Sequence, residues 1–369
     1  MKLACIVGAR PNFVKMAPLV EEIRRRPALR YCLIHTGQHY SPEMSRAFFD
    51  ELEMPEPDVN LEAGGGTAIA QIAEILRLLE PALTEAAPDV VVVVGDVNST
   101  LAGALAAAKL GIPVAHVEAG LRSFDRFMPE EINRVVTDAL SDFLFVSEPS
   151  GERNLLAEGV PREKIFFAGN VMIDTLLRFR AKAERSDVLE RLELADGRYA
   201  IATLHRPSNV DQAGSLAGLV RALGEISRRI PIVFPVHPRT AQALRAAGLD
   251  ASVDPRALRL VAPLGYLDFL RLMSRARLVL TDSGGIQEET TILQVPCLTL
   301  RNNTERPVTI EQGTNRLVGT DPAKIVAAAL DALEAPPPAG RVPRLWDGRA
   351  SARILDVLTS PQSSPAPTG

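Results

Sequence analysis

The sequence holds few cysteines, no long apolar run and no large excess of charge of either sign. Three cysteines occur in 369 residues, and Cys5, Cys32 and Cys297 each lie in a short apolar segment. An odd number of such thiols does not suit a disulfide framework, and their spacing does not suit a metal cluster. We therefore expect reduced core thiols, no metal and no other cofactor.

The weak net charge and the absence of a membrane-length run limit the partners. A formal net charge of −4 gives no basic surface that would attract nucleic acid. The longest valine run, Val90–Val94, is far too short to cross a bilayer, and Lys2–Val7 reads as a first strand with no cleavable signal after it. We expect a cytoplasmic protein with a small ligand and with neither a nucleic-acid nor a membrane partner.

What the sequence does contain is an alternation of short apolar runs with helical patterns, the rhythm of parallel α/β domains. The first series of predicted strands is Leu3–Val7, Tyr31–Ile34, Val90–Val94, Val114–Val117 and Phe143–Val146. The second series is Tyr199–Ala202, Ile232–Phe234, Leu258–Val261, Leu278–Leu280 and Cys297–Leu300. The helices predicted between them include Ala68–Leu79, Leu101–Leu110, Glu130–Leu140 and Leu216–Arg228.

Two such series predict two Rossmann-like, doubly wound domains, over residues 1–170 and 171–346. The connection is expected near Gly169–Asp174, followed by a charged helix over Leu176–Leu192. After a proline-rich stretch, Asp347 is expected to cap a last helix within residues 347–359. The Ser/Pro-rich tail, 360–369, is expected to be disordered.

The segment Thr281–Glu289 carries the strongest functional signal. It follows an apolar strand and opens a helix with Ser283-Gly284-Gly285, so successive N–H groups and the helix dipole would favour a phosphate. Glu289 lies about one turn further on, where a sugar hydroxyl could donate to its carboxylate. The alternative is a purely structural turn in which Ser283 caps the helix.

Other unusual polar residues follow the predicted strands, at the sheet edge where α/β proteins bind ligands. Gly8-Ala-Arg10-Pro, Gly95-Asp96 and Glu118 follow strands of the first series, and His205-Arg206 and His237-Pro-Arg239 follow strands of the second. Two such edges facing each other would form a cleft.

Each polar residue also has a simpler interpretation. Arg10 is either a solvated turn residue or, as we favour, a phosphate clamp. Asp96, taken alone, is better explained as a cap for the helix that follows. Glu118 ends an apolar run, where a solvated carboxylate has little reason to lie, so a functional role is favoured.

The remaining charged residues and the histidines also have simpler interpretations. Glu130 and Glu131 fit the start of a helix, where acids complement the dipole, and Arg134 lies one turn on. Lys15 is expected on a helix surface unless it turns back into the cleft. His35, His39 and His116 are best explained as structural residues. His205 is better explained as functional.

Together these motifs resemble the non-hydrolysing UDP-N-acetylglucosamine 2-epimerase family over nearly the whole chain. The matching segments are Gly8-Ala-Arg-Pro11, Gly95-Asp96, His116–Arg122, Pro129–Arg134, His205-Arg206, Thr281–Glu289, Thr304–Pro307, Glu311–Thr314 and Leu317–Thr320. The resemblance implies a glycosyltransferase-B-like pair of Rossmann-like domains, a last helix that crosses back to the first domain, and a homodimer.

The resemblance also implies roles for individual residues. Those implied to be catalytic are Asp96, Glu118, Glu130 and His205. Those implied to bind the UDP-sugar are Arg10, Lys15, Arg134, Tyr266, Ser283, Gly284, Gly285 and Glu289, with Pro263–Phe269 beside the uracil. The implied reaction inverts C2 of UDP-N-acetylglucosamine by elimination and re-addition of UDP, which gives UDP-N-acetylmannosamine for cell-surface polysaccharides.

Two points about substrate and regulation stay open. The segment Arg122–Pro129 is shared with relatives acting on UDP-2,3-diacetamido-2,3-dideoxy-glucuronate, whereas Arg306 fits the acetylglucosamine enzymes better. In many bacterial members Gln38-His39 acts with a longer basic segment to bind a second, activating UDP-sugar. Here Gly64-Gly-Gly66 stands in place of that segment.

Rival functions share part of the pattern. A UDP-sugar glycosyltransferase would need an acceptor, a hydrolysing epimerase would release N-acetylmannosamine and UDP, and a sensor would bind UDP without turnover. A nicotinamide dehydrogenase is disfavoured, because Gly8-Ala-Arg-Pro lacks the glycine spacing of the dinucleotide fingerprint.

Overall fold

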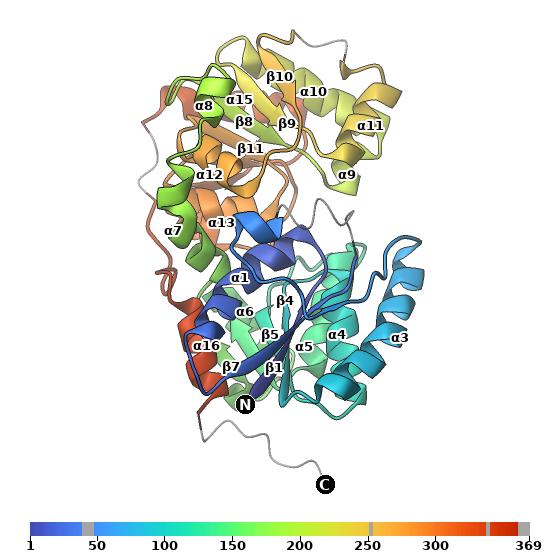
Figure 1. Ribbon diagram of the computed structural model, residues 1–369. Coiled ribbons are helices and arrows are strands. Elements are labelled where there is room, and N and C mark those ends of the chain that lie inside the picture. The colour runs from blue at the N-terminus through green and yellow to red at the C-terminus, as the bar shows by residue number, and fades with distance from the viewer. Residues whose placement is uncertain (39–47, 251–253, 337–339, 361–369) are drawn as a thin grey trace. The chain divides into compact units, whose positions relative to one another are not determined.

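The computed structural model describes residues 1–38, 48–250, 254–336 and 340–360 and divides the chain into two compact units (Figure 1). The first unit is Met1–Arg178 together with the segment from Arg344 onward, and the second is Phe179–Pro343. The predicted boundaries were 170/171 and 346/347. The first boundary in the structure falls inside helix α7 (Val171–Ala183).

A parallel sheet of seven strands forms the centre of the first unit, in the order β3-β2-β1-β4-β5-β6-β7. Its strands are β1 (Lys2–Val7), β2 (Arg30–His35), β3 (Val59–Asn60), β4 (Val90–Val94), β5 (Val114–Ala119), β6 (Phe143–Val146) and β7 (Ile165–Phe167). The apolar runs recognised in the sequence are the buried central strands, which need apolar side chains on both faces. The two edge strands β3 and β7 were not predicted.

Helices cover both faces of this sheet (Figure 1). They are α1 (Arg10–Arg24), α3 (Ala68–Ala86), α4 (Asn98–Lys109), α5 (Pro129–Leu140), α6 (Pro149–Ala157), a 3₁₀ turn at Arg162–Lys164, and α16 (Ala350–Leu358). Helix α16 packs against α1, so the last helix returns to the first unit as the resemblance implied.

The second unit is built on a parallel sheet of six strands in the order β10-β9-β8-β11-β12-β13. Its strands are β8 (Ala200–Thr203), β9 (Ile232–Pro235), β10 (Leu258–Val261), β11 (Leu278–Thr281), β12 (Cys297–Thr299) and β13 (Asn315–Leu317). Its helices are α8 (Val188–Arg191), α9 (Pro207–Val210), α10 (Ala213–Ser227), α11 (Pro238–Ala246), α12 (Tyr266–Ser274), α13 (Gly284–Leu293), α14 (Val308–Glu311) and α15 (Pro322–Glu334). The predicted class, two parallel α/β units, is confirmed.

Two predictions about helices are wrong in detail. The segment Leu176–Leu192 is not one helix, because α7 ends at Ala183 and Ser186 accepts from the N–H of Val188 at the start of α8. The first turn of α16 is capped by Asp174 rather than by Asp347: the Asp174 carboxylate accepts from the N–H groups of Ala350 and Ser351. Asp347 accepts from the N–H of Arg349, one residue earlier.

Cys5, Cys32 and Cys297 are free and buried, as predicted. Burial raises the pKa of the Cys5 and Cys297 thiols to about 12, so both stay protonated at neutral pH. Within the described parts of the chain, no helix is both long enough and apolar enough to cross a bilayer. His39 and residues 361–369 of the predicted disordered tail lie outside the described residues.

Candidate functional site

In each unit the strand order reverses direction at one point, and that point marks where doubly wound sheets bind ligands. In the first unit it lies between β1 and β4, and in the second between β8 and β11. Arg10 lies at the start of the helix that follows β1, and Asp96, His205 and Ser283 lie in the loops that follow β4, β8 and β11. The topology therefore places four of the predicted site residues at the two expected binding edges.

Helix α13 begins directly at the edge of the second sheet. Ser283 occupies its N-cap position, yet the Ser283 side chain accepts no hydrogen bond from the first turn. Ser283 is thus the N-cap residue, as the structural alternative expected, but its hydroxyl does not cap the helix. The Ser283 hydroxyl and the N–H groups that open the helix form the donor set that an anion needs.

A buried arginine lies against this helix start. A Cβ atom added to Gly284 would come within 2.4 Å of the Arg306 guanidinium, so only glycine permits this approach. Arg306 is itself paired with the buried carboxylate of Glu288, at 2.8 Å. A guanidinium held against the first turn adds positive charge at the end of the helix where the dipole is already positive.

Tyr266 and Glu289, both predicted to contact the UDP-sugar, lie together in the second unit. Both are buried, and the Tyr266 hydroxyl donates to Glu289 Oε1 at 3.2 Å. Tyr266 opens α12 and Glu289 lies in the second turn of α13. The bond fixes the Glu289 carboxylate, which has further acceptor positions for sugar hydroxyls.

His205 lies just after the end of β8, beside the loop that follows β11. Its Nδ1 lies 2.9 Å from the fully buried carboxylate of Asp282. That carboxylate also accepts from the backbone N–H groups of His205 and Arg206 and from the Asn209 amide. Burial alone would raise the Asp282 pKa, but electrostatic attraction to His205 and these hydrogen bonds hold the pKa below its usual value. Asp282 was quoted in the sequence motif without a role.

Arg206 joins a buried ionic cluster behind this edge. Its guanidinium pairs with Glu305 at 3.2 Å, and Glu305 also pairs with Arg301 at 2.8 Å. Burial would raise the Glu305 pKa, but Arg301, Arg306 and Arg206 together lower it far below the usual range. Arg206 thus holds the loop in place from inside the protein.

In the first unit, the turn after β1 is tightly packed. A Cβ atom at Gly8 would meet the Ser99 hydroxyl at 1.9 Å. Asn12, which the sequence analysis did not single out, accepts from the N–H of Gly8 and donates to the carbonyl of Val94. Asn12 thus ties the ends of β1 and β4 together. Arg10 opens α1, and its guanidinium lies 4.5 Å from the ring centre of Phe48.

Lys15 is not on a helix surface, contrary to the simpler expectation. It is buried, and its Nζ forms an ion pair of 2.7 Å with Glu118. The ammonium has room because residue 95 is glycine: a Cβ there would lie 2.8 Å from Lys15 Nζ. Such a pair is retained at a cost in desolvation, which favours a functional reason for it.

Glu118 also has an unusual backbone conformation. Its φ of 75° lies in the left-handed region, and the pairing of β5 with β6 shifts register between Val117 and Ala119. For a residue with a long side chain this conformation costs roughly 1–3 kcal/mol and is concentrated at functional sites. The irregular end of β5 thus turns the Glu118 side chain to meet Lys15.

Asp96 is not the cap of α4, because Val97 occupies the N-cap position and no side chain caps that helix. Instead its carboxylate pairs with Arg134 at 2.5 Å. Arg134 also forms an ion pair with Glu131. Burial would raise the Glu131 pKa, but the N–H of Ser123 and the charge of Arg134 hold that pKa below its usual value. Of the two neighbouring acids, Glu131 is therefore structural. Glu130 is half-buried and makes no hydrogen bond or ion pair with any described residue.

The remaining histidines fit their predicted structural roles where they are described. His116 is held from both sides, with Nδ1 2.6 Å from Asp138 and Nε2 2.8 Å from the carbonyl of Gly95. Asp138 also accepts from the N–H of Gly120. This network fixes the strand end on either side of Glu118. His35 is buried and bonds Asn60.

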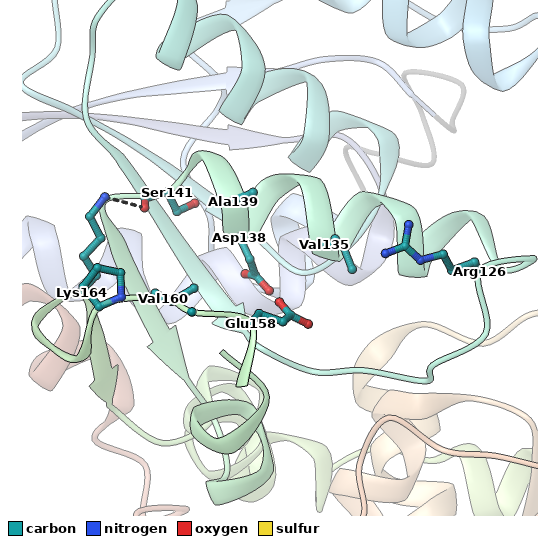
Figure 2. Close-up of a pocket in the computed structure, with 10 residues that line it drawn as sticks. Arg126, Val135, Asp138, Ala139, Ser141, Glu158, Val160 and Lys164 are labelled. Carbon is teal, nitrogen blue, oxygen red and sulfur yellow. Dashed lines mark hydrogen bonds between the residues drawn. The ribbon is translucent and has the colours of Figure 1, made fainter. Parts of the chain in front are cut away.

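A cavity of about 420 Å³ lies on the first unit between α5 and the segment that follows α6 (Figure 2). None of the twelve predicted site residues lines it. Its acids, Asp138 and Glu158, pair with Arg122, and Lys164 pairs with Asp142. These charges are already compensated, and Arg126, the other charged residue of the lining, is exposed, so we assign no ligand to the cavity. Among the described residues, no three His, Cys, Asp or Glu side chains are grouped to hold a metal.

Comparisons with known proteins agree with the fold and with the motifs. The model of the UDP-N-acetylglucosamine 2-epimerase family matches residues 21–359. A protein of that name from Methanocaldococcus jannaschii is 43% identical over 370 residues, which cover 97% of this chain and 99% of the relative. UDP-2,3-diacetamido-2,3-dideoxy-D-glucuronate 2-epimerase from Pseudomonas aeruginosa is 41% identical over 362 residues, with the same coverage.

A solved structure shows the same agreement. The crystal structure of Methanocaldococcus jannaschii UDP-GlcNAc 2-epimerase in complex with UDP-GlcNAc and UDP matches with a TM-score of 0.92 at 44% identity, covering 97% of this chain and 99% of that one. The predicted family and its glycosyltransferase-B-like architecture are confirmed. The chain belongs to the UDP-N-acetylglucosamine 2-epimerase family.

Proposed function

We propose that this chain interconverts UDP-N-acetylglucosamine and UDP-N-acetylmannosamine without hydrolysis. The observation that carries the proposal is Glu118, a buried carboxylate in a left-handed backbone conformation, paired with Lys15 at the ligand edge of the first unit. A UDP-sugar transferase or a UDP sensor does not remove a proton from the sugar, so neither needs a buried, strained carboxylate at this position. The relative from Methanocaldococcus jannaschii has the same named activity.

The chemistry begins at the diphosphate. The proton on C2 of an N-acetylhexosamine is not acidic, so the C1–O bond to UDP must break first or nearly so. UDP leaves with the electron pair of that bond. In our proposal the N–H groups of residues 283–285, the Ser283 hydroxyl, Arg10 and His205 stabilise the negative charge that develops there.

The carboxylates of the first unit act on the sugar. As C1 becomes cationic, one acid among Asp96, Glu118 and Glu130 takes the C2 proton, and the C1–C2 double bond of a glycal forms. A second carboxyl group of this set, which starts protonated, then gives its proton to the opposite face of C2, and the oxygen of UDP attacks C1. Atoms and charges balance without a cofactor. Arg134 and Lys15 hold Asp96 and Glu118 in position by the ion pairs described above.

Incubation of the purified protein with UDP-N-acetylglucosamine alone tests this function. We expect proton NMR to show UDP-N-acetylmannosamine accumulating to equilibrium. Release of free N-acetylmannosamine with UDP would instead indicate a hydrolysing enzyme. An unchanged substrate that nevertheless binds would contradict the proposal and favour a transferase or a sensor.

A second substrate is favoured by one observation, the 41% identity to the diacetamido-glucuronate epimerase of Pseudomonas aeruginosa. The same incubation with UDP-2,3-diacetamido-2,3-dideoxy-glucuronate separates the two. We expect the higher kcat/KM with UDP-N-acetylglucosamine. The reverse order would assign the chain to the uronate.

The family resemblance also leads us to propose a homodimer that acts in the cytoplasm. Sedimentation at several protein concentrations measures the oligomeric state. A monomer at all concentrations that support full activity would contradict a dimer.

A further inference from the structure

Among the described residues of the second unit, Asp282 is the buried carboxylate that contacts a predicted catalytic residue, His205, and the proposed function assigns it no role. It directly precedes Ser283 in the loop that leaves β11. A hydrogen bond of 2.6 Å between the Thr203 and Thr281 hydroxyls joins the ends of β8 and β11. This junction brings Asp282 and His205 side by side at the point where the strand order reverses.

The hydrogen bonds of Asp282 divide between its two oxygens. Oδ2 accepts from the N–H of His205 at 3.0 Å, from the N–H of Arg206 at 3.0 Å and from the Asn209 amide at 3.1 Å. Oδ1 lies 2.9 Å from His205 Nδ1 and 3.1 Å from the His205 N–H. An ionised carboxylate only accepts hydrogen bonds, so Nδ1 must be the donor and must carry a proton.

The other ring nitrogen has a different environment. Nε2 of His205 makes no hydrogen bond with any described residue, and 44% of the His205 side chain is exposed. Asp282, by contrast, is fully buried. The ring is therefore anchored at Nδ1 from inside the protein and presents Nε2 outward.

We infer that Asp282 is a positioning residue for His205: its carboxylate fixes the imidazole so that Nδ1 is protonated and Nε2 is the nitrogen offered to the ligand. A carboxylate that orients a histidine in this way sets its tautomer and leaves Nε2 as the nitrogen that takes up a proton. Once protonated, Nε2 can donate to the leaving diphosphate, which is the role proposed for His205 above. The tautomer is a property of the free protein. The effect on turnover rests on the proposed function.

A nearby histidine provides an internal comparison. The His237 ring lies 6.4 Å from that of His205, centre to centre, and its Nδ1 accepts from the N–H of Arg239. Neutral His237 must therefore carry its proton on Nε2. The two neighbouring rings are expected to be opposite tautomers, and nitrogen NMR distinguishes them.

The substitution Asp282→Asn should reverse the tautomer of His205. The amide oxygen is expected at the Oδ2 position, where three N–H groups point, which puts the amide NH₂ opposite His205 Nδ1. Nδ1 must then accept, and the proton moves to Nε2. In this variant, protonation of Nδ1 as well as Nε2 would place a cationic ring against the amide NH₂ group, which cannot stabilise the charge. The carboxylate that stabilises the doubly protonated ring in the wild type is absent.

The test is long-range proton–nitrogen NMR of histidine-labelled, ligand-free protein, with His205 assigned by its absence in His205→Gln. We expect a protonated Nδ1 in the wild type and a bare Nδ1 in Asp282→Asn. A bare Nδ1 in the wild type would overturn the inference, and this result needs no variant at Asp282 that might unfold. It also does not depend on whether the protein turns over any sugar nucleotide.

Kinetics gives the second readout. Asp282→Asn is expected to lower kcat on the order of 10²- to 10⁴-fold while KM changes by less than about threefold. Asp331→Asn, which alters an exposed carboxylate in the same unit, is the control and should leave both unchanged. If Asp282→Asn reverses the tautomer but keeps kcat within about threefold, the positioning role is refuted. If the wild type shows the expected tautomer but no epimerisation, the proposed function fails and the tautomer assignment stands.

Discussion

Replacing Glu118 with glutamine is expected to lower turnover on the order of 10²- to 10⁴-fold, the loss usual when an acid–base group is removed. Glutamine keeps the size of the side chain but can neither take nor return the C2 proton. UDP affinity should change little, because the residues that we assign to the diphosphate other than Arg10 lie in the second unit. The measurements are initial rates by NMR and UDP binding by calorimetry.

The same change also costs stability, which must be separated from the catalytic effect. Breaking a buried ion pair typically costs about 3–5 kcal/mol, and an amide that still accepts from Lys15 should cost less. Asp174→Asn is the matched control, since it removes another buried carboxylate of the first unit, one that caps α16. We expect that variant to lose stability and to keep its turnover. A Glu118→Gln enzyme that stays folded and turns over at the wild-type rate would rule out a catalytic role for Glu118.

Gly284→Ala is expected to weaken UDP binding by about 10- to 100-fold, which corresponds to roughly 1.4–2.7 kcal/mol. The added methyl group would lie 2.4 Å from the Arg306 guanidinium, so the guanidinium must move. Arg306 cannot move without weakening its pairs with the buried carboxylates of Glu288 and Glu305. The change therefore disturbs the helix start and the cation behind it at once.

A glycine in open space provides the control for this prediction. Gly224 lies in helix α10, and a Cβ atom added there meets nothing within 4 Å. Gly224→Ala should keep full UDP affinity and gain up to about 1 kcal/mol of stability, because alanine favours a helix more than glycine does. Titration calorimetry and thermal unfolding measure both quantities. Unchanged UDP affinity in a folded Gly284→Ala protein would show that the diphosphate does not bind at this helix start.

The parts of the fold with a strong local signal were predictable from the sequence. Buried central strands such as Val90–Val94 must be apolar on both faces, so the runs stand out. The edge strands β3, β7 and β13 are only two or three residues long, so they do not stand out, even though β7 is the apolar segment Ile-Phe-Phe. The break between α7 and α8 depends on Ser186, whose hydroxyl accepts from the N–H of Val188 just after the break, a signal too weak to interrupt a charged helical pattern.

The candidate site was predictable where chain order alone brings residues together. Parallel strands of one sheet deliver their carboxyl ends to one edge. The motifs at Gly8, Asp96 and Glu118 could therefore be grouped in the first unit, and those at His205 and Ser283 in the second. Pairings between side chains could not be derived in this way. Lys15 is 103 positions from Glu118, and Asp282 is 77 from His205.

Some of these pairings nevertheless had a signal in the sequence. Gly95 leaves the space that the Lys15 ammonium fills, and Asp282 stands directly beside the Ser-Gly-Gly motif. A glycine or a carboxylate at a strand end is a reason to look for a partner across the sheet. Which partner it meets depends on the packing of the helices.

The measurement that tests the central claim most directly is epimerisation in heavy water, followed by proton NMR of the sugar. Departure and return of UDP through a glycal require the C2 proton to be lost and replaced. The product and the re-formed substrate should therefore carry deuterium at C2, with traces of free UDP and glycal. Inversion of C2 with full retention of the original hydrogen would contradict the account.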